Sequence, residues 1–141
     1  MLLNVSKVEV WTAVLPDRPG AIAAKLESLA RAGANLELIT AWRSPDKAAE
    51  GILAVSPLEG EKVMAAAVAA GFHKSVETAA IRIEAPNEPG MAYRLARALS
   101  LEGLNLKGMS SSVIGHEAAV YVVLDSLADA EKAVRGLQRE M

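Results

Sequence analysis

The residues best suited to bind a small polar ligand lie in one short segment that occurs twice. Pro16-Asp17-Arg18-Pro19-Gly20 returns 70 residues later as Pro86-Asn87-Glu88-Pro89-Gly90. Glycine has no Cβ, so a ligand can approach its backbone closely. A helix that begins after the segment would offer free N–H groups and a positive dipole end to a carboxylate. Because Asp17 or Asn87 could accept a hydrogen bond from an ammonium group, the segment suits an amino acid or a similar zwitterion.

Two asparagines extend this candidate site. Asn35 and Asn105 stand at the predicted start of the next strand, at the end of the sheet to which the helix returns. An amide can donate to a carboxylate and accept from an amine. A purely structural interpretation stays open, because Pro-Gly is a common turn and Asp and Asn often cap helices. Duplication would copy structural residues as well as functional ones.

The repeat continues far beyond the loop. At the same offset Gly33 matches Gly103, and the pairs Ser56/Ser126 and Glu61-Lys62/Glu131-Lys132 predict a repeat without a gap. A unit this long is not a solenoid repeat, which usually has 20–50 residues. The sequence therefore predicts a duplicated small domain, with domain 1 at residues 8–77 and domain 2 at residues 78–141.

Each copy is predicted to have the order β-α-β-β-α. Proline ends the first strand, and glycine ends the first helix as a C-terminal cap. In the first copy the predicted strands are Val8–Val14, Asn35–Arg43 and Gly51–Val55, with helices after Gly20 and over Glu59–Ala70. In the second copy the strands are Thr78–Ala85, Asn105–Ile114 and Ala118–Asp125, with helices after Gly90 and over Leu127–Gln138.

A closing strand would make each copy a ferredoxin-like βαββαβ domain, an α+β fold with both helices on one face of an antiparallel sheet. Phe72–Glu77 supplies this strand for domain 1. Domain 2 ends after its second helix, and the offset assigns its closing strand to residues 2–7, chiefly Leu2–Ser6. The two domains would then exchange strands. The alternative is a frayed N-terminal tail.

The composition limits the class of protein. The 141 residues are 52% hydrophobic and 23% charged, with a net charge of −2 and no cysteine. A negative chain with no basic run argues against a nucleic-acid surface. The lack of cysteine excludes disulfides and thiolate metal sites, and two isolated histidines, His73 and His116, predict no metal site. No apolar stretch is as long as a membrane span, so we expect a cytoplasmic protein that binds no membrane and no cofactor.

The order of elements and the loop motif together resemble the ACT domain. The residues that carry the resemblance are Asp17-Arg18-Pro19-Gly20 with Gly33-Ala34-Asn35-Leu36, and Asn87-Glu88-Pro89-Gly90 with Gly103-Leu104-Asn105-Leu106. The resemblance covers nearly the whole chain as two tandem copies with no catalytic domain. It implies a regulatory module that senses an amino acid near the domain interface. The ligand contacts that it implies are Asp17, Arg18, Gly20, Asn35, Asn87, Glu88, Gly90 and Asn105.

The chain departs from the family pattern in two respects. Serine-sensing members can carry a histidine two positions before the loop Asn, where this chain has Leu15 and Ala85. The loops also differ in charge, since Asp17-Arg18 stands where the second copy has Asn87-Glu88. The sequence therefore predicts two unequal sites, or one occupied site and one structural loop.

Three functions remain open. The first is a non-enzymatic amino-acid sensor, which pairs as a homodimer through its exposed sheet edges and acts on an enzyme partner. The second is a constitutive interaction module or regulatory subunit of an enzyme of amino-acid metabolism, with no ligand. The third is a small enzyme, which we disfavour because no acid/base pair stands out.

Overall fold

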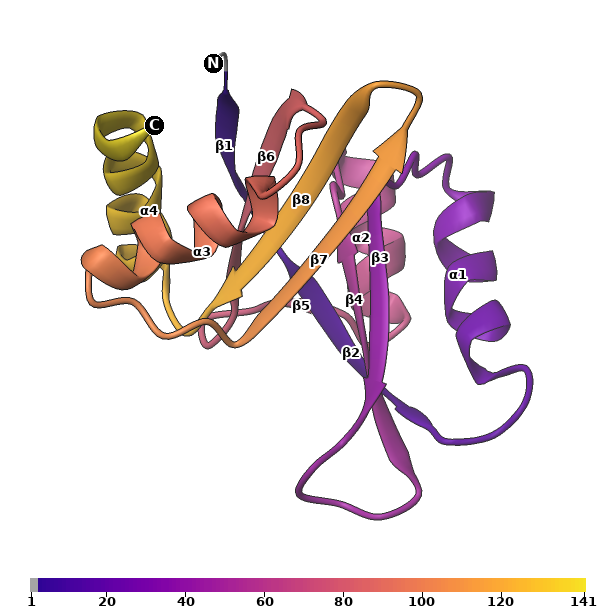
Figure 1. The fold of residues 1–141 in the computed structure, drawn as a ribbon. Coiled ribbons are helices and arrows are strands. Elements are labelled where there is room, and N and C mark those ends of the chain that lie inside the picture. Colours follow the sequence, from indigo (N-terminus) through magenta and orange to yellow (C-terminus); the bar gives the residue numbers. More distant parts are fainter. Residues whose placement is uncertain (1–2) are drawn as a thin grey trace. The chain divides into compact units, whose positions relative to one another are not determined.

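A computed structural model describes residues 3–141, which form eight strands and four helices in the order predicted for a duplicated fold (Figure 1). In the first half of the chain the elements are β1 (Asn4–Val8), β2 (Trp11–Pro16), α1 (Ala21–Arg31), β3 (Leu38–Arg43), β4 (Glu50–Ser56) and α2 (Glu61–Ala69). In the second half they are β5 (His73–Lys74), β6 (Ala79–Pro86), α3 (Met91–Leu101), β7 (Gly108–Ile114), β8 (Glu117–Leu124) and α4 (Leu127–Glu140). None of these helices is long and apolar enough to cross a membrane.

The chain divides into two compact units. Domain 1 is Glu9–Ser75, and domain 2 combines Val76–Met141 with Met1–Val8. Each unit contains one four-stranded antiparallel sheet and two helices. The predicted fold class, two ferredoxin-like α+β domains, is confirmed.

In domain 1 the sheet has the order β3-β4-β2-β5. Alternate residues of β2 point to the helices, so Trp11, Ala13 and Leu15 are buried while Val14 is exposed. These three side chains pack with Leu53 of β4 and Leu29 of α1 in one hydrophobic cluster. The cluster lies between one face of the sheet and the two helices, and it holds the domain together.

In domain 2 the sheet has the order β1-β6-β8-β7, and β1 is its closing edge strand. Val5 lies opposite Ile83 and Lys7 lies opposite Ile81, in antiparallel register. Val5 packs against the domain 2 core, and Lys7 reaches Glu131 of α4 at 3.3 Å. The N-terminal strand therefore belongs to domain 2, as the offset of the repeat predicts. Leu2, which falls in the predicted strand, lies outside the described residues.

The two copies do not keep one offset throughout. Leu15 pairs with Gly51 in domain 1, and Ala85 pairs with Ala118 in domain 2. The offset is thus 70 in the first strand but 67 in the strand that pairs with it. The change lies in the hairpin, where the wide β3–β4 loop of domain 1 becomes a tight β7–β8 turn in domain 2 (Figure 1).

The prediction of a repeat without a gap is therefore wrong. Ser56 pairs with Leu38 at the end of β4, whereas Ser126 caps α4 by accepting a hydrogen bond from the Asp129 N–H at 3.1 Å. Their match in the sequence is a coincidence of composition. The closing strand of domain 1 is also shorter than predicted, because β5 contains His73 and Lys74 alone and pairs with β2.

Candidate functional site

The Pro-Gly loops lie where the first strand of each domain passes into the first helix. Gly20 and Gly90 are the N-terminal caps of α1 and α3, with φ of +87° and +80°. Residues with a Cβ rarely adopt this left-handed conformation, whereas glycine adopts it readily. No atom lies within 4 Å of the place where a Cβ would stand at either position. Backbone conformation, and not crowding, therefore requires glycine in these loops.

Both helices begin without a side-chain cap. Neither α1 nor α3 receives a side-chain hydrogen bond at its cap, and neither has an acidic residue in its first turn. By contrast, α2 has Glu61 and α4 has Asp129 in the first turn. The N–H groups at the start of α1 and α3 are therefore less compensated by negative charge than those of the other two helices.

An arginine accompanies the acidic residue of each loop. Arg43, the last residue of β3, donates from Nε to Asp17 Oδ2 at 2.7 Å. The hydrogen bond to this carboxylate raises the pKa of Arg43, which is exposed and stays charged. In domain 2, Arg94 of α3 donates from Nη2 to Glu88 Oε2 at 2.9 Å. Each loop thus presents a guanidinium group beside an open helix terminus, although the two arginines come from different elements.

The loops themselves are fixed by the neighbouring hairpin. The Asp17 N–H donates to the carbonyl of Ala49 at 2.9 Å, and the Asn87 N–H donates to the carbonyl of His116 at 2.8 Å. These equivalent bonds hold the start of each loop against the β3–β4 or β7–β8 connection. Besides the two glycines, four loop residues were predicted as ligand contacts. All four are exposed, namely Asp17, Arg18, Asn87 and Glu88.

Asn35 and Asn105 do not join the loop of their own domain. The strands β3 and β7 begin at Leu38 and Gly108, so each asparagine lies three residues before its strand. Glu37 donates to the carbonyl of Ser56 at the far end of β4, whereas Asp17 lies beside Ala49 at its beginning. The seven residues of β4 separate these ends by about 20 Å.

Each asparagine therefore lies at the end of the sheet to which the helix runs, as predicted, and this is the end away from the Pro-Gly loop of its own domain. The eleven residues of α1 carry the chain about 16 Å away from Gly20 before it turns back. Both asparagines are exposed, and their amide groups make no hydrogen bond with any residue from 3 to 141.

No group of three or more His, Asp or Glu side chains within residues 3–141 is arranged to hold a metal ion. His73 lies in β5, and its Nε2 is 3.5 Å from the hydroxyl oxygen of Thr12. His116 lies in the β7–β8 turn, where its backbone carbonyl accepts from Asn87.

Comparison with known proteins shows the same fold in several solved structures. Protein BT0572 from Bacteroides thetaiotaomicron matches with 24% identity and a TM-score of 0.75, over 98% of this chain and 90% of that one. The regulatory subunit of aspartate kinase from Thermus thermophilus matches with 15% identity and a TM-score of 0.68, over 100% and 98%. The corresponding subunit from Thermus flavus matches with 16% identity and a TM-score of 0.60, over 99% and 95%.

No protein-family model matches the sequence, and no curated protein matches it. At these identities the structural neighbours establish the fold alone. They span nearly the whole chain, both domains included, and two of the three are regulatory subunits. This chain therefore has the fold of two ferredoxin-like domains, which it shares with these regulatory subunits.

Proposed function

We propose that this chain is a cytoplasmic, non-enzymatic regulatory protein, a tandem of ACT domains that binds an amino acid at its strand-to-helix loops. Two observations support the proposal. The structural neighbours include regulatory subunits of aspartate kinase. The loop that would bind the ligand occurs at the same place in both domains, before α1 and before α3.

The observation that carries the proposal is the pairing of an open helix N-terminus with a guanidinium group. Arg43 uses Nε for Asp17, and Arg94 uses Nη2 for Glu88, so other donors of each guanidinium stay available. In domain 2, Nε of Arg94 is buried, so the donors that face a ligand there are the Nη groups. A ligand carboxylate would accept from these Nη groups and from N–H groups of the first helical turn beyond Ala21 and Met91, whose own N–H groups donate to the carbonyls of Arg18 and Glu88.

The ligand ammonium group would meet a different partner in each domain. In domain 1 it would meet the carboxylate of Asp17, which already accepts from Arg43. In domain 2 it would meet the neutral amide of Asn87 beside the Glu88–Arg94 pair. The two sites are therefore chemically unequal, and we expect them to differ in affinity. Asn35 and Asn105 would contribute only where another domain or subunit brings them to a loop.

Ligand binding would act by changing the populations of two conformations or oligomers that an enzyme of amino-acid metabolism distinguishes. Sheet edges give a route to a homodimer. The strands β3 and β7 each pair on one side only within their own sheet, so each has an outer edge at which a second copy of the chain would pair.

A second candidate is a constitutive interaction module with no ligand. It is favoured by apolar side chains exposed on β7, where Met109, Val113 and Ile114 are 38%, 49% and 82% exposed. Such residues on an open edge are typical of a protein–protein contact. The two candidates differ in whether an amino acid stabilises the protein.

A thermal-shift screen against the proteinogenic amino acids tests the proposal. At least one of them is expected to raise the melting temperature, because saturation at 100 times Kd stabilises the folded state by about 2.7 kcal/mol. The variant Arg43→Gln is expected to reduce this shift, since it removes a carboxylate donor next to α1. Arg31→Gln is the matched control, because Arg31 also pairs with an acid, Glu27, in domain 1 but lies in the last turn of α1.

Two outcomes would count against the proposal. If no amino acid changes the melting temperature, the interaction module becomes the better account. If Arg43→Gln and Arg31→Gln give the same shift as the unsubstituted protein, the ligand binds elsewhere than the first loop.

A further inference from the structure

A recess lies in domain 1 between the end of β2 and the β3–β4 loop, and of the Pro-Gly segment only Pro16 lines it. It has a volume of about 440 Å³ and is lined by Val14, Leu15, Pro16, Ala48, Ala49 and Glu50. A smaller recess of about 170 Å³ adjoins it and shares Val14 and Glu50. The larger volume falls within the range of sites that hold small molecules.

The loop that forms one wall is well fixed. The hydroxyl of Ser44 accepts hydrogen bonds from the N–H groups of Asp46 and Lys47, both at 3.3 Å. The backbone N–H of Ser44 donates to the carbonyl of Glu50 at 2.9 Å. Ala49 has φ of +65°, a left-handed conformation that is costly for a residue with a Cβ. Its carbonyl is held by the Asp17 N–H. The recess is therefore built by a specific loop conformation.

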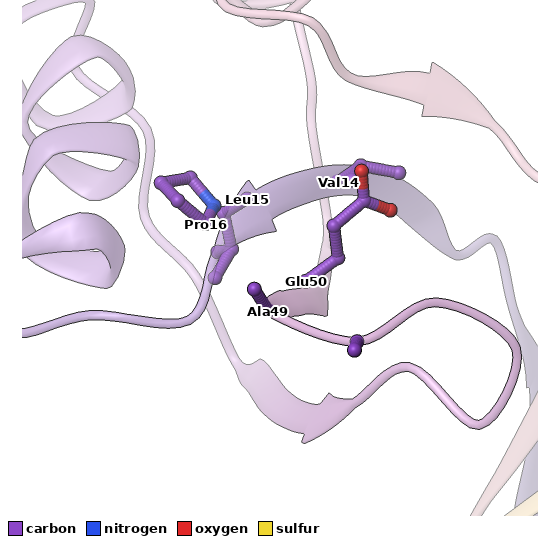
Figure 2. A pocket seen from close by; sticks show the side chains of 6 residues that line it. Val14, Leu15, Pro16, Ala49 and Glu50 are labelled. Carbon is purple, nitrogen blue, oxygen red and sulfur yellow. The ribbon is translucent and has the colours of Figure 1, made fainter.

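The chemistry of the recess is that of an apolar wall with one carboxylate. Val14 is 56% exposed on the face of the sheet opposite to the helices, and Figure 2 shows the carboxylate of Glu50 extending toward it. Glu50 is half-buried, and its carboxylate makes no hydrogen bond or ion pair with any residue in the described part of the chain. A carboxylate in this position would gain from a cationic partner.

The remaining charges favour the same sign of ligand. The adjoining recess adds Asp46 and Lys47 to Glu50, which leaves one net negative charge. Lys47 forms no ion pair with either carboxylate, so it does not neutralise Glu50 from within residues 3–141. An anionic ligand would be repelled by the carboxylates of Glu50 and Asp46. An ammonium group would instead pair with the carboxylate of Glu50.

Domain 2 provides an internal comparison. Glu117 holds the place of Glu50, because Pro86 pairs with Glu117 as Pro16 pairs with Glu50. The connection before Glu117 is the tight turn at Gly115 and His116, so no wide loop stands over it. Glu50 and Glu117 thus hold equivalent positions in their sheets. They differ because a wide loop lies beside Glu50 and a tight turn precedes Glu117.

We propose that this recess is a binding site for a small organic cation, an ammonium group on a short apolar chain, with Glu50 as its anionic partner and Val14 against its apolar part. The site lies on the β3–β4 loop, so it goes beyond the proposed amino-acid site. It would take an amine that has no carboxylate.

Nuclear magnetic resonance titrations with three probes of equal chain length test this inference. n-Butylammonium is expected to cause saturable amide shifts at Val14, Ala49 and Gly51, while butanoate and butanol cause much smaller ones. Glu50→Gln should weaken n-butylammonium binding by about tenfold or more, because it removes a charge-assisted hydrogen bond. Glu117→Gln, the matched control in domain 2, should leave the affinity unchanged.

A second variant guards against an indirect effect of Glu50→Gln. Ala48→Trp, at an exposed loop position, should obstruct the recess and also abolish the shifts. The inference is overturned if n-butylammonium causes no saturable shift at these amides, or if it binds Glu50→Gln as tightly as the unsubstituted protein. The Arg43→Gln variant tests the Pro-Gly loop and the Glu50→Gln variant tests the recess, so either proposal can fail while the other stands.

Discussion

Removal of residues 1–7 is expected to lower the free energy of unfolding of domain 2 by about 3 kcal/mol or more. The deletion takes away four of the five residues of β1, which pair with β6 from Lys7 opposite Ile81 to Asn4 opposite Glu84. It also removes Leu3 and Val5 from the edge of the domain 2 core. Amide hydrogen exchange checks the effect, since Ile83 and Val122 should lose protection while Leu53 of domain 1 keeps it.

Two substitutions in β1 separate strand loss from a general effect of shortening the chain. Val5→Glu places a carboxylate against the core and is expected to destabilise domain 2. Ser6→Glu, one residue along, alters an exposed side chain on the opposite face and is expected to have little effect. Unchanged stability after the deletion, or equal effects of the two substitutions, would contradict the assignment of β1 to domain 2.

Leu53→Ala is expected to destabilise domain 1 by about 3 kcal/mol, which corresponds to a melting temperature lower by roughly 10 °C or more. Leu53 lies in β4, between β2 and β3, and is fully buried in the domain 1 core. Removal of its side chain leaves a cavity that the sheet and two helices cannot easily close. The tryptophans, Trp11 and Trp42, both lie in domain 1, so their fluorescence during urea unfolding reports this change.

Ile39→Ala is the matched control for this substitution. Ile39 is in the neighbouring strand β3 and is 51% exposed, so its truncation is expected to cost less than about 1 kcal/mol. A similar loss of stability in both variants would mean that the core of domain 1 does not lie where the structure places it.

Most of the fold follows from patterns that are local in the sequence. The duplicated loop, the glycine after each first helix and the alternation in β2 and β6 predict the elements and their order. The N-terminal strand was predictable because Phe72–Glu77 is the predicted closing strand of domain 1. The same offset places the equivalent strand of domain 2 at the N-terminus. The structure confirms this fold class and has β1 as the closing strand.

The hairpins show where local patterns mislead. Chance identities at Ser56/Ser126 and Glu61-Lys62/Glu131-Lys132 indicated one constant offset, whereas strand pairing shortens the second copy by three residues. The hairpin connections differ in length, since residues 44–49 join β3 to β4 whereas residues 115–116 join β7 to β8. That shortening also removes the loop that forms the recess beside Glu50.

The site was less predictable than the fold because its contacts join residues far apart in the chain. Arg43 reaches Asp17 across 26 positions, and this contact depends on the register of β3 against β4. Arg94 has no counterpart in the first copy, where Ala24 holds its place, so comparison of the copies could not find it. The position of Asn35 depends on the direction of α1, which carries the chain to the other end of the sheet.

The most direct test of ligand sensing at the Pro-Gly loops is a map of amide shifts in the presence of amino acids. Spectra of the full chain would be recorded with the amino acid that gives the largest thermal shift, or with a mixture of all of them if none does. We expect saturable shifts concentrated at Gly20 and Ala21, at Gly90 and Met91, or at one of these pairs. Spectra that stay unchanged at both helix starts would contradict the account.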